Sequence, residues 1–202
     1  MNTLTITVAA ALLFALLFPA TNSDRNSTNS ETSETEQTLI DFRNTSASAW
    51  QIVNDSVMGG ISLSTLQLHG DGYAQFTGTV SLENNGGFAS VRTRAQRPVN
   101  LSGFDGFSVH VLGDGKTYSL RLRTVKNGRL TSYSYEARFT TTPGEWETHK
   151  LAYSDFNPVF RGRAVRGNPE LNSDAILEIG FMIQDGQEGP FHLDIQSLSV
   201  FR

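Results

Sequence analysis

Apolar and polar residues alternate with a period of two from Leu39 to the end of the chain, in short runs separated by Gly, Asn, Asp and Pro. Such alternation is typical of strands that bury one face, and regular breaks are typical of an all-β sandwich. No segment carries a sustained helical stripe. The pattern therefore predicts about ten strands packed as two sheets. They are expected near residues 39–42, 50–53, 62–68, 73–80, 87–93, 104–112, 117–125, 130–139, 145–151, 177–184 and 191–201.

The sharpest local prediction is a hairpin at Asn127-Gly128, because this pair accepts the positive φ angles of a two-residue type I′ turn. The turn sets Leu122 opposite Tyr133 on one face and Arg121 opposite Ser134 on the other. Apolar residues are therefore paired with apolar residues on one face of the hairpin, and polar with polar on the other. The turn type and the hydrophobic pattern thus predict the same register.

Two irregularities interrupt the alternation. The last expected strand changes phase between Ile195 and Leu198, which predicts a β-bulge near Gln196-Ser197. Between Leu151 and Leu177 the alternation stops altogether. We interpret this stretch as a long loop, and loops of that length inside a compact domain are usually functional.

The residues before the alternating region are expected to lie outside the domain. An apolar run from Val8 to Phe18, followed by small residues, has the layout of a secretory signal peptide with cleavage after Ser23. Residues 24–38 are almost wholly Ser, Thr, Asn and acidic, which indicates a disordered linker. We therefore expect a signal peptide (1–23), this linker and one domain (39–202). The protein would be exported, periplasmic or extracellular, with no membrane span after cleavage; an uncleaved anchor is the alternative.

Charge and composition exclude several classes of function. The net charge is −4, and most of it comes from the segment before residue 39, so the domain itself is close to neutral. A domain without a strong field is not expected to bind nucleic acid. There is no Cys, and the four His residues lie far apart without the spacing of a metal motif. GxSxG is also absent. We expect no enzyme, no metal and no cofactor.

Arginine is the most suggestive residue type, because it outnumbers Lys strongly among the 16 basic residues. Its planar guanidinium binds carboxylates through two hydrogen bonds and stacks on aromatic rings. In an extended FRGR segment, Arg161 and Arg163 would project to the same side and clamp one carboxylate. Arg92, Arg121 and Arg123 also fall where they can converge. Either they pair with acidic groups of the domain itself, or they form a binding site.

Several motifs are distinctive. WQIVNDSVMGGIS occupies residues 50–62, and it is followed by GGFAS at 86–90, GDGKTY at 113–118, Trp146, FNPVFRGR at 156–163, IGFM at 179–182 and GPF at 189–191. Together they resemble the complex I intermediate-associated protein 30 (CIA30) family over residues 39–202. The resemblance implies a galactose-binding-like jelly roll, the architecture of many carbohydrate-binding modules. It also implies relatives that act as assembly factors or chaperones for respiratory complex I, and it carries over no catalytic residue.

These observations favour a non-catalytic module that binds a protein partner in a chaperone-like way in an exported setting. A carbohydrate-binding module of the cell envelope is the alternative, with Tyr73 and the aromatic residues of 153–160 as candidates. The Met58-Gly59-Gly60 segment is also explained by a tight loop that serves stability alone. The candidate binding residues are Asn54, Asp55, Met58, Gly59, Gly60, Arg92, Arg121, Arg123, Arg161 and Arg163.

Overall fold

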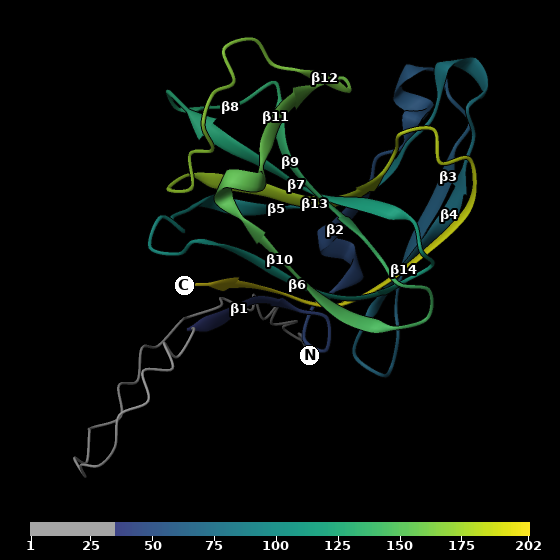
Figure 1. Cartoon of the computed structure of the whole chain (residues 1–202), viewed down its shortest axis with the longest axis horizontal. Helices are drawn as coiled ribbons and strands as arrows, with labels where there is room; N and C mark the ends of the chain where they lie inside the picture. Colours follow the sequence, from purple (N-terminus) through teal and green to yellow (C-terminus); the bar gives the residue numbers. More distant parts are fainter. Residues whose placement is uncertain (1–34) are drawn as a thin grey trace, which may run out of the picture. The chain divides into compact units, whose positions relative to one another are not determined.

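The computed structural model describes residues 35–202, which form two antiparallel sheets packed face to face (Figure 1). Sheet A has the order β10 (Trp146–Ala152), β6 (Gly106–Gly113), β14 (Gly189–Phe201), β4 (Ala74–Val80), β3 (Leu63–Leu68), and β1 (Glu36–Asp41) pairs with β14. Sheet B has the order β12 (Arg163–Ala164), β11 (Asn157–Phe160), β9 (Ser134–Thr140), β7 (Thr117–Lys126), β13 (Ile176–Ile183), β5 (Ala89–Val99), β2 (Trp50–Ile52), and β8 (Arg129–Leu130) pairs with β7. Short 3-10 helices are η1 (Ala47–Ala49), η2 (Asp55–Met58), η3 (Glu83–Asn85) and η4 (Tyr153–Asp155).

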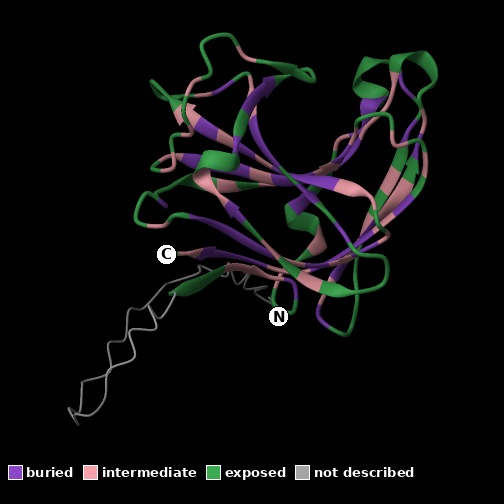
Figure 2. Ribbon diagram, in the orientation of Figure 1, coloured by how far each residue is buried: buried purple, intermediate pink, exposed green. Residues whose placement is uncertain are grey.

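The core lies between the sheets, because each strand sends alternate side chains inward. On β7, Tyr118, Leu120 and Leu122 are buried, whereas Arg121 and Arg123 point out of the sandwich. Buried residues follow the middle of both sheets, and exposed residues gather in the loops (Figure 2). The predicted all-β, galactose-binding-like jelly-roll sandwich is confirmed.

The Asn127-Gly128 turn has the predicted geometry, with φ angles of 51° and 73°. Lys126 pairs with Arg129 as expected, but the register then shifts by two residues, so that Arg121 lies opposite Glu136 and not Ser134. The predicted pairing of Leu122 with Tyr133 is wrong for the same reason, since Leu122 pairs with Tyr135.

Residues 132 and 133 cause this shift by leaving the ladder, because the Thr131 N–H still donates to the Thr124 carbonyl over 3.0 Å. The Thr131 hydroxyl donates to the Tyr133 carbonyl over 2.8 Å, and the Arg123 guanidinium donates to the Thr131 carbonyl. The excursion takes up two extra residues before β9 and keeps every later side chain on its own face.

The predicted β-bulge in the last strand is confirmed, since the pairing of β14 with β6 shifts between Ile195 and Ser197. The stretch expected to be one long loop instead holds η4, β11 and β12. Arg161 and Gly162, with φ angles of 50° and 72°, form a two-residue turn in which Phe160 pairs with Arg163. The extended FRGR geometry is therefore wrong, and Arg161 and Arg163 do not project as successive outward residues of one strand.

Strand β1 begins at Glu36, earlier than predicted, because the second half of β14 offers an open edge to which the backbone of residues 36–41 pairs. Backbone pairing of this kind needs no apolar side chains. The expected signal peptide and most of the expected linker fall in residues 1–34, outside the described residues. Within residues 35–202, no helix is long and apolar enough to cross a membrane.

Candidate functional site

Asp55 of the WQIVNDSVMGG motif joins two loops. Its side chain is fully buried, and its carboxylate accepts hydrogen bonds from the N–H of Ser62 (2.9 Å), Gly87 (2.7 Å) and Phe88 (3.3 Å), and from the Ser62 hydroxyl. Burial alone would raise the pKa of Asp55, but these donors outweigh it and lower the pKa below its usual value. The charged carboxylate therefore holds the 56–62 loop against the 82–88 loop.

Asn54 and Gly60 complete this structural node. The Asn54 amide oxygen accepts from the Ser64 hydroxyl (2.8 Å) and the Ser90 N–H (3.3 Å). A Cβ at Gly60 would lie 2.4 Å from Asp55 Cγ, and Gly59 has a φ of 93°. Of the candidate binding residues, Asn54, Asp55, Gly59 and Gly60 thus shape the loops, and the buried Asn54 and Asp55 side chains do not face solvent.

The two loops that Asp55 joins, together with the first residue of β3, display large apolar side chains. Between 44% and 73% of each of these residues is exposed. We call this set the apolar rim: Val57, Met58, Ile61, Leu63 and Leu82. Among the five motif residues proposed as binding candidates, Met58 is therefore the one with a large apolar side chain exposed to solvent.

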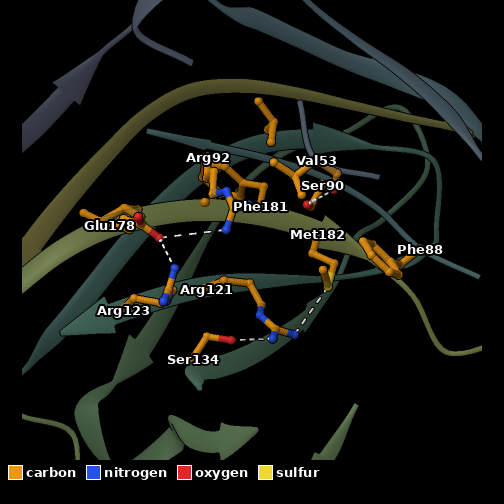
Figure 3. A pocket seen from close by; sticks show the side chains of 13 residues that line it. Val53, Phe88, Ser90, Arg92, Arg121, Arg123, Ser134, Glu178, Phe181 and Met182 are labelled. Carbon is orange, nitrogen blue, oxygen red and sulfur yellow. Dashed lines mark hydrogen bonds and ion pairs between the residues drawn. The ribbon is translucent and has the colours of Figure 1, made fainter. Parts of the chain in front are cut away.

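At the base of these loops, a hollow of about 190 Å³ opens on the outer face of sheet B (Figure 3). Val53 and Phe88 line it on the loop side, and Met182 lies on β13. Arg92 comes from β5, and Arg121 and Arg123 come from β7. The structure thus brings these three predicted arginines together, although Arg92 is far from the other two in the sequence.

Two buried carboxylates hold these arginines in place. The Arg123 Nη1 atom lies 2.9 Å from Glu178 Oε2, and Arg92 Nη1 lies 3.9 Å from the same oxygen. Arg121 Nη1 lies 2.6 Å from Glu136 Oε2, and burial of Arg121 lowers its pKa more than this carboxylate raises it. Neither Glu136 nor Glu178 was singled out from the sequence, because the pairing depends on strand register.

The charges of this outer face do not cancel. Five guanidinium groups face three carboxylates, so the face carries a net charge of +2. The arginines are Arg92, Arg94, Arg121, Arg123 and Arg138, and the acids are Glu136, Glu178 and Asp185. A partly desolvated, net positive hollow favours an anionic group of a ligand.

A second hollow, of about 330 Å³, lies at the opposite edge of sheet B, beside the β11–β12 hairpin. Phe160, Arg163 and Arg166 line it together with Tyr133. Phe160 is 47% exposed, and the Arg161 guanidinium carbon lies 5.5 Å from its ring centroid. In residues 35–202, no carboxylate lies within ion-pair distance of Arg161, Arg163 or Arg166. We call Phe160, Arg163 and Arg166 the basic edge.

Sheet A carries a different feature on its outer surface. The rings of His110 and Trp146 lie 5.3 Å apart, those of Trp146 and Tyr73 5.8 Å apart, and those of Tyr73 and His69 4.7 Å apart. Trp146 is 40% exposed. These four residues form an aromatic row that includes Tyr73, one of the aromatic residues that the sequence suggested for carbohydrate binding. Over the described part of the chain, no three His, Asp or Glu side chains gather as a metal site.

Comparison with known proteins identifies relatives over most of the domain. The family described as Complex I intermediate-associated protein 30 (CIA30) matches residues 40–195. An uncharacterised Schizosaccharomyces pombe protein is 30% identical over 74% of this chain and 76% of its own length. The mitochondrial complex I intermediate-associated protein 30 is 26% identical in Neurospora crassa and 27% in mouse, over 62% and 75% of this chain. The chain spans about half the length of these two relatives (50% and 52%).

Solved structures support the fold. A family 11 carbohydrate-binding module of Clostridium thermocellum superposes with a TM-score of 0.64 at 16% identity, over 83% of this chain and 95% of the module. An agarase superposes with a TM-score of 0.54 at 13% identity, over 82% of this chain and 24% of the enzyme. At these identities, the likeness concerns architecture and not ligands.

The relatives contradict the predicted location. The proteins from Neurospora crassa, mouse and Caenorhabditis elegans are all named as mitochondrial, so the prediction of an exported, periplasmic or extracellular protein is wrong. The prediction rested on an apolar run at residues 8–18, and length and hydrophobicity alone do not identify the machinery that reads such a run.

Proposed function

Because the chain belongs to the complex I intermediate-associated protein 30 family, we propose that it is a non-catalytic module that binds a protein partner, as an assembly factor or chaperone does. The observation that carries the proposal is the net positive outer face of sheet B, held by Glu136 and Glu178 and flanked by the apolar rim. Exposed arginine and large apolar side chains are the groups that dominate protein interfaces.

The arginine network supports binding because its side chains are ordered before a partner arrives. Arg123 donates to the Thr131 carbonyl and pairs with Glu178, and Arg121 pairs with Glu136. A side chain that is already fixed loses less conformational entropy on association. Such a face can therefore hold a partner at a smaller entropic cost than a surface of free arginines.

The same hollow offers little for catalysis. Its lining contains no His, Lys or Tyr, and its one carboxylate, Glu178, is within 4 Å of three guanidinium groups. A general base needs a carboxylate or imidazole that is free to take a proton. This arrangement supports a binding role.

Native gel electrophoresis of cells that express the tagged chain tests the proposal. We expect the chain to migrate with an intermediate of respiratory complex I. Arg92→Glu combined with Arg94→Glu should abolish this association, because both side chains are at least partly exposed and the change reverses the charge of the face. Arg97→Glu, an exposed residue of β5 outside the hollow, is the control. Unchanged complex I assembly in cells that lack the chain would contradict the proposal.

A carbohydrate ligand is the second candidate, and the aromatic row on sheet A is the observation that favours it. Exposed rings beside polar groups are the usual means of stacking sugars. Trp146 is 40% exposed whereas Trp50 is 9% exposed, so a change in tryptophan fluorescence on adding a mixed-linked β-glucan tetrasaccharide would report on Trp146. Loss of that response in Trp146→Ala would support this candidate, and no response in the parent protein would exclude that sugar.

A further inference from the structure

We propose that the partner presents an acidic, amphipathic polypeptide segment that lies across the outer face of sheet B, with its acidic residues on the basic edge and its apolar residues on the apolar rim. This inference rests on the proposed function and adds the chemistry of the partner. It follows from the positions of the charged and apolar side chains, which lie at opposite edges of sheet B and in its flanking loops.

In the described part of the chain, two arginines without an internal acid lie together at one edge of the sheet. Arg163 and Arg166 line a hollow with the half-exposed Phe160, and neither has a carboxylate within ion-pair distance among residues 35–202. Arg121 and Arg123, by contrast, are already paired with Glu136 and Glu178. A carboxylate of the partner therefore forms its most favourable ion pairs at the basic edge, where no acid of the described domain competes for the arginines.

The apolar surface lies at the other edge. Val53 and Phe88, at the base of the two loops that Asp55 joins, line the hollow near β5 and β13, and four of the five rim residues belong to these same loops. Because Asp55 fixes both loops, the rim is a preorganised surface and not a collection of mobile side chains. Leu63, at 73% exposure, and Val57, at 68%, are the most exposed members of this surface.

The order of the strands sets the length of the partner segment. From β12, which carries Arg163, to β2 the sheet contains β11, β9, β7, β13 and β5, which makes six strand-to-strand steps. At about 4.8 Å per step, the distance from the basic edge to the apolar rim is roughly 29 Å. An extended chain covers this distance with about nine residues. Acidic residues should occupy one end and the middle of the segment, and apolar residues the other end.

The small net charge of the outer face favours a polypeptide over a nucleic acid as the partner. The face carries a net charge of only +2, and the two exposed arginines of the basic edge add to one end of it. A polyanion would also meet the apolar rim, where it finds no partner. A segment with both acidic and apolar residues can pair with the arginines of the basic edge and pack on the apolar rim.

Fluorescence anisotropy with three synthetic peptides of about twelve residues, long enough to cover the estimated span, tests the proposal. The first peptide has an Asp/Glu-rich half and a Leu/Ile-rich half, the second replaces the acids with Lys, and the third replaces the apolar residues with Ser. We expect measurable binding of the first peptide only, with affinity that falls as salt is raised because exposed charges are screened. A single-stranded RNA of similar length should bind no better than the Lys peptide.

Variants locate the two edges. Arg163→Ala with Arg166→Ala, and separately Met58→Ser with Ile61→Ser, should each weaken the first peptide about tenfold or more. The matched controls are Arg97→Ala and Val99→Ser, since both residues are exposed and lie at the far end of β5 from the hollow. All these side chains are at least partly exposed, so the variants should unfold at the temperature of the parent protein.

Three results would overturn the inference: equal binding of the Lys peptide, RNA binding that depends on the same residues, or equal loss in the control variants. The proposed function fails separately. If the chain migrates with a complex I intermediate but no peptide binds, only the chemistry of the partner is wrong. If the first peptide binds as expected but no association with complex I is found, the proposed function is wrong and the acidic segment belongs to another partner.

Discussion

Replacement of Asp55 by Asn tests whether the family motif acts through stability. The two side chains have nearly the same size, so the change removes charge without opening a cavity. Three backbone N–H groups and the Ser62 hydroxyl donate to the carboxylate, and the side chain is fully buried. In the Asp55→Asn variant, the amide nitrogen would have to face at least one of these donors.

The size of the effect follows from those contacts. A hydrogen bond to a charged group contributes about 1.5 to 3 kcal/mol, and a buried donor left without a partner costs about 1 to 3 kcal/mol. Because the four bonds share one carboxylate, their contributions do not add fully. We expect Asp55→Asn to lower the free energy of unfolding by about 3 kcal/mol, which a domain of ordinary stability survives.

Urea denaturation followed by far-ultraviolet circular dichroism measures this loss. Asp71→Asn is the matched control, since Asp71 lies on a turn with 84% of its side chain exposed and should be nearly neutral. If Asp55→Asn changes the denaturation midpoint no more than Asp71→Asn does, the carboxylate does not hold the loops together and the reasoning fails.

The pH dependence gives a second readout of the same group. The pKa of Asp55 is lower in the folded protein than its usual 3.8, so the folded state binds the proton less tightly than the unfolded state. The stabilisation is therefore fully present above the unfolded pKa and is lost as pH falls through the folded pKa. The free energy of unfolding should therefore fall less steeply with decreasing pH in Asp55→Asn than in the parent protein. An equal fall in both proteins would contradict the assignment.

Three further predictions follow from single contacts. Gly128→Val should cost about 1 kcal/mol or more in urea denaturation, because Gly128 has a φ of 73°, where a β-branched residue is strained. Gly180→Ala should lower the melting temperature clearly, since its Cβ would lie 2.5 Å from the Val91 carbonyl oxygen, a backbone atom that cannot move aside. Glu136→Gln should cost about 3 kcal/mol or more by leaving the Arg121 guanidinium buried without its acid; recovery of stability on adding Arg121→Met would confirm this origin, and no loss in the single variant would contradict it.

Much of the fold could be predicted because periodicity and turn chemistry act locally. The phase change after Ile195 identified the bulge in β14, and Asn127-Gly128 identified a type I′ turn. The β11–β12 hairpin was missed, since its strands are very short and its turn places a non-glycine residue, Arg161, at positive φ. A Pro at position 158 also argued against a strand, although the structure accommodates it in β11.

The candidate site could be predicted only in part. The sequence suggested that Arg92, Arg121 and Arg123 converge, and the structure brings them to one hollow. The sequence did not distinguish buried motif residues from solvent-exposed ones. Asp55 and Met58 lie three positions apart in the same 3-10 helix, yet one is fully buried and the other is half exposed. Burial in such a short element depends on which loops pack against it, and that information is not local.

The two-residue shift in β9 explains why the ion pair between Arg121 and Glu136 escaped prediction. A slip of one residue would turn every side chain to the other face and would be visible in the hydrophobic pattern. A slip of two residues leaves the faces unchanged, and so it replaces Ser134 with Glu136 opposite Arg121 without any trace in the alternation. Sequence periodicity thus determines which side chains line the outer face, whereas register determines which of their charges remain free. Arg121 and Arg123 are paired with carboxylates, whereas Arg163, within residues 35–202, is not, so an arginine without an internal acid lies at the edge of the sheet.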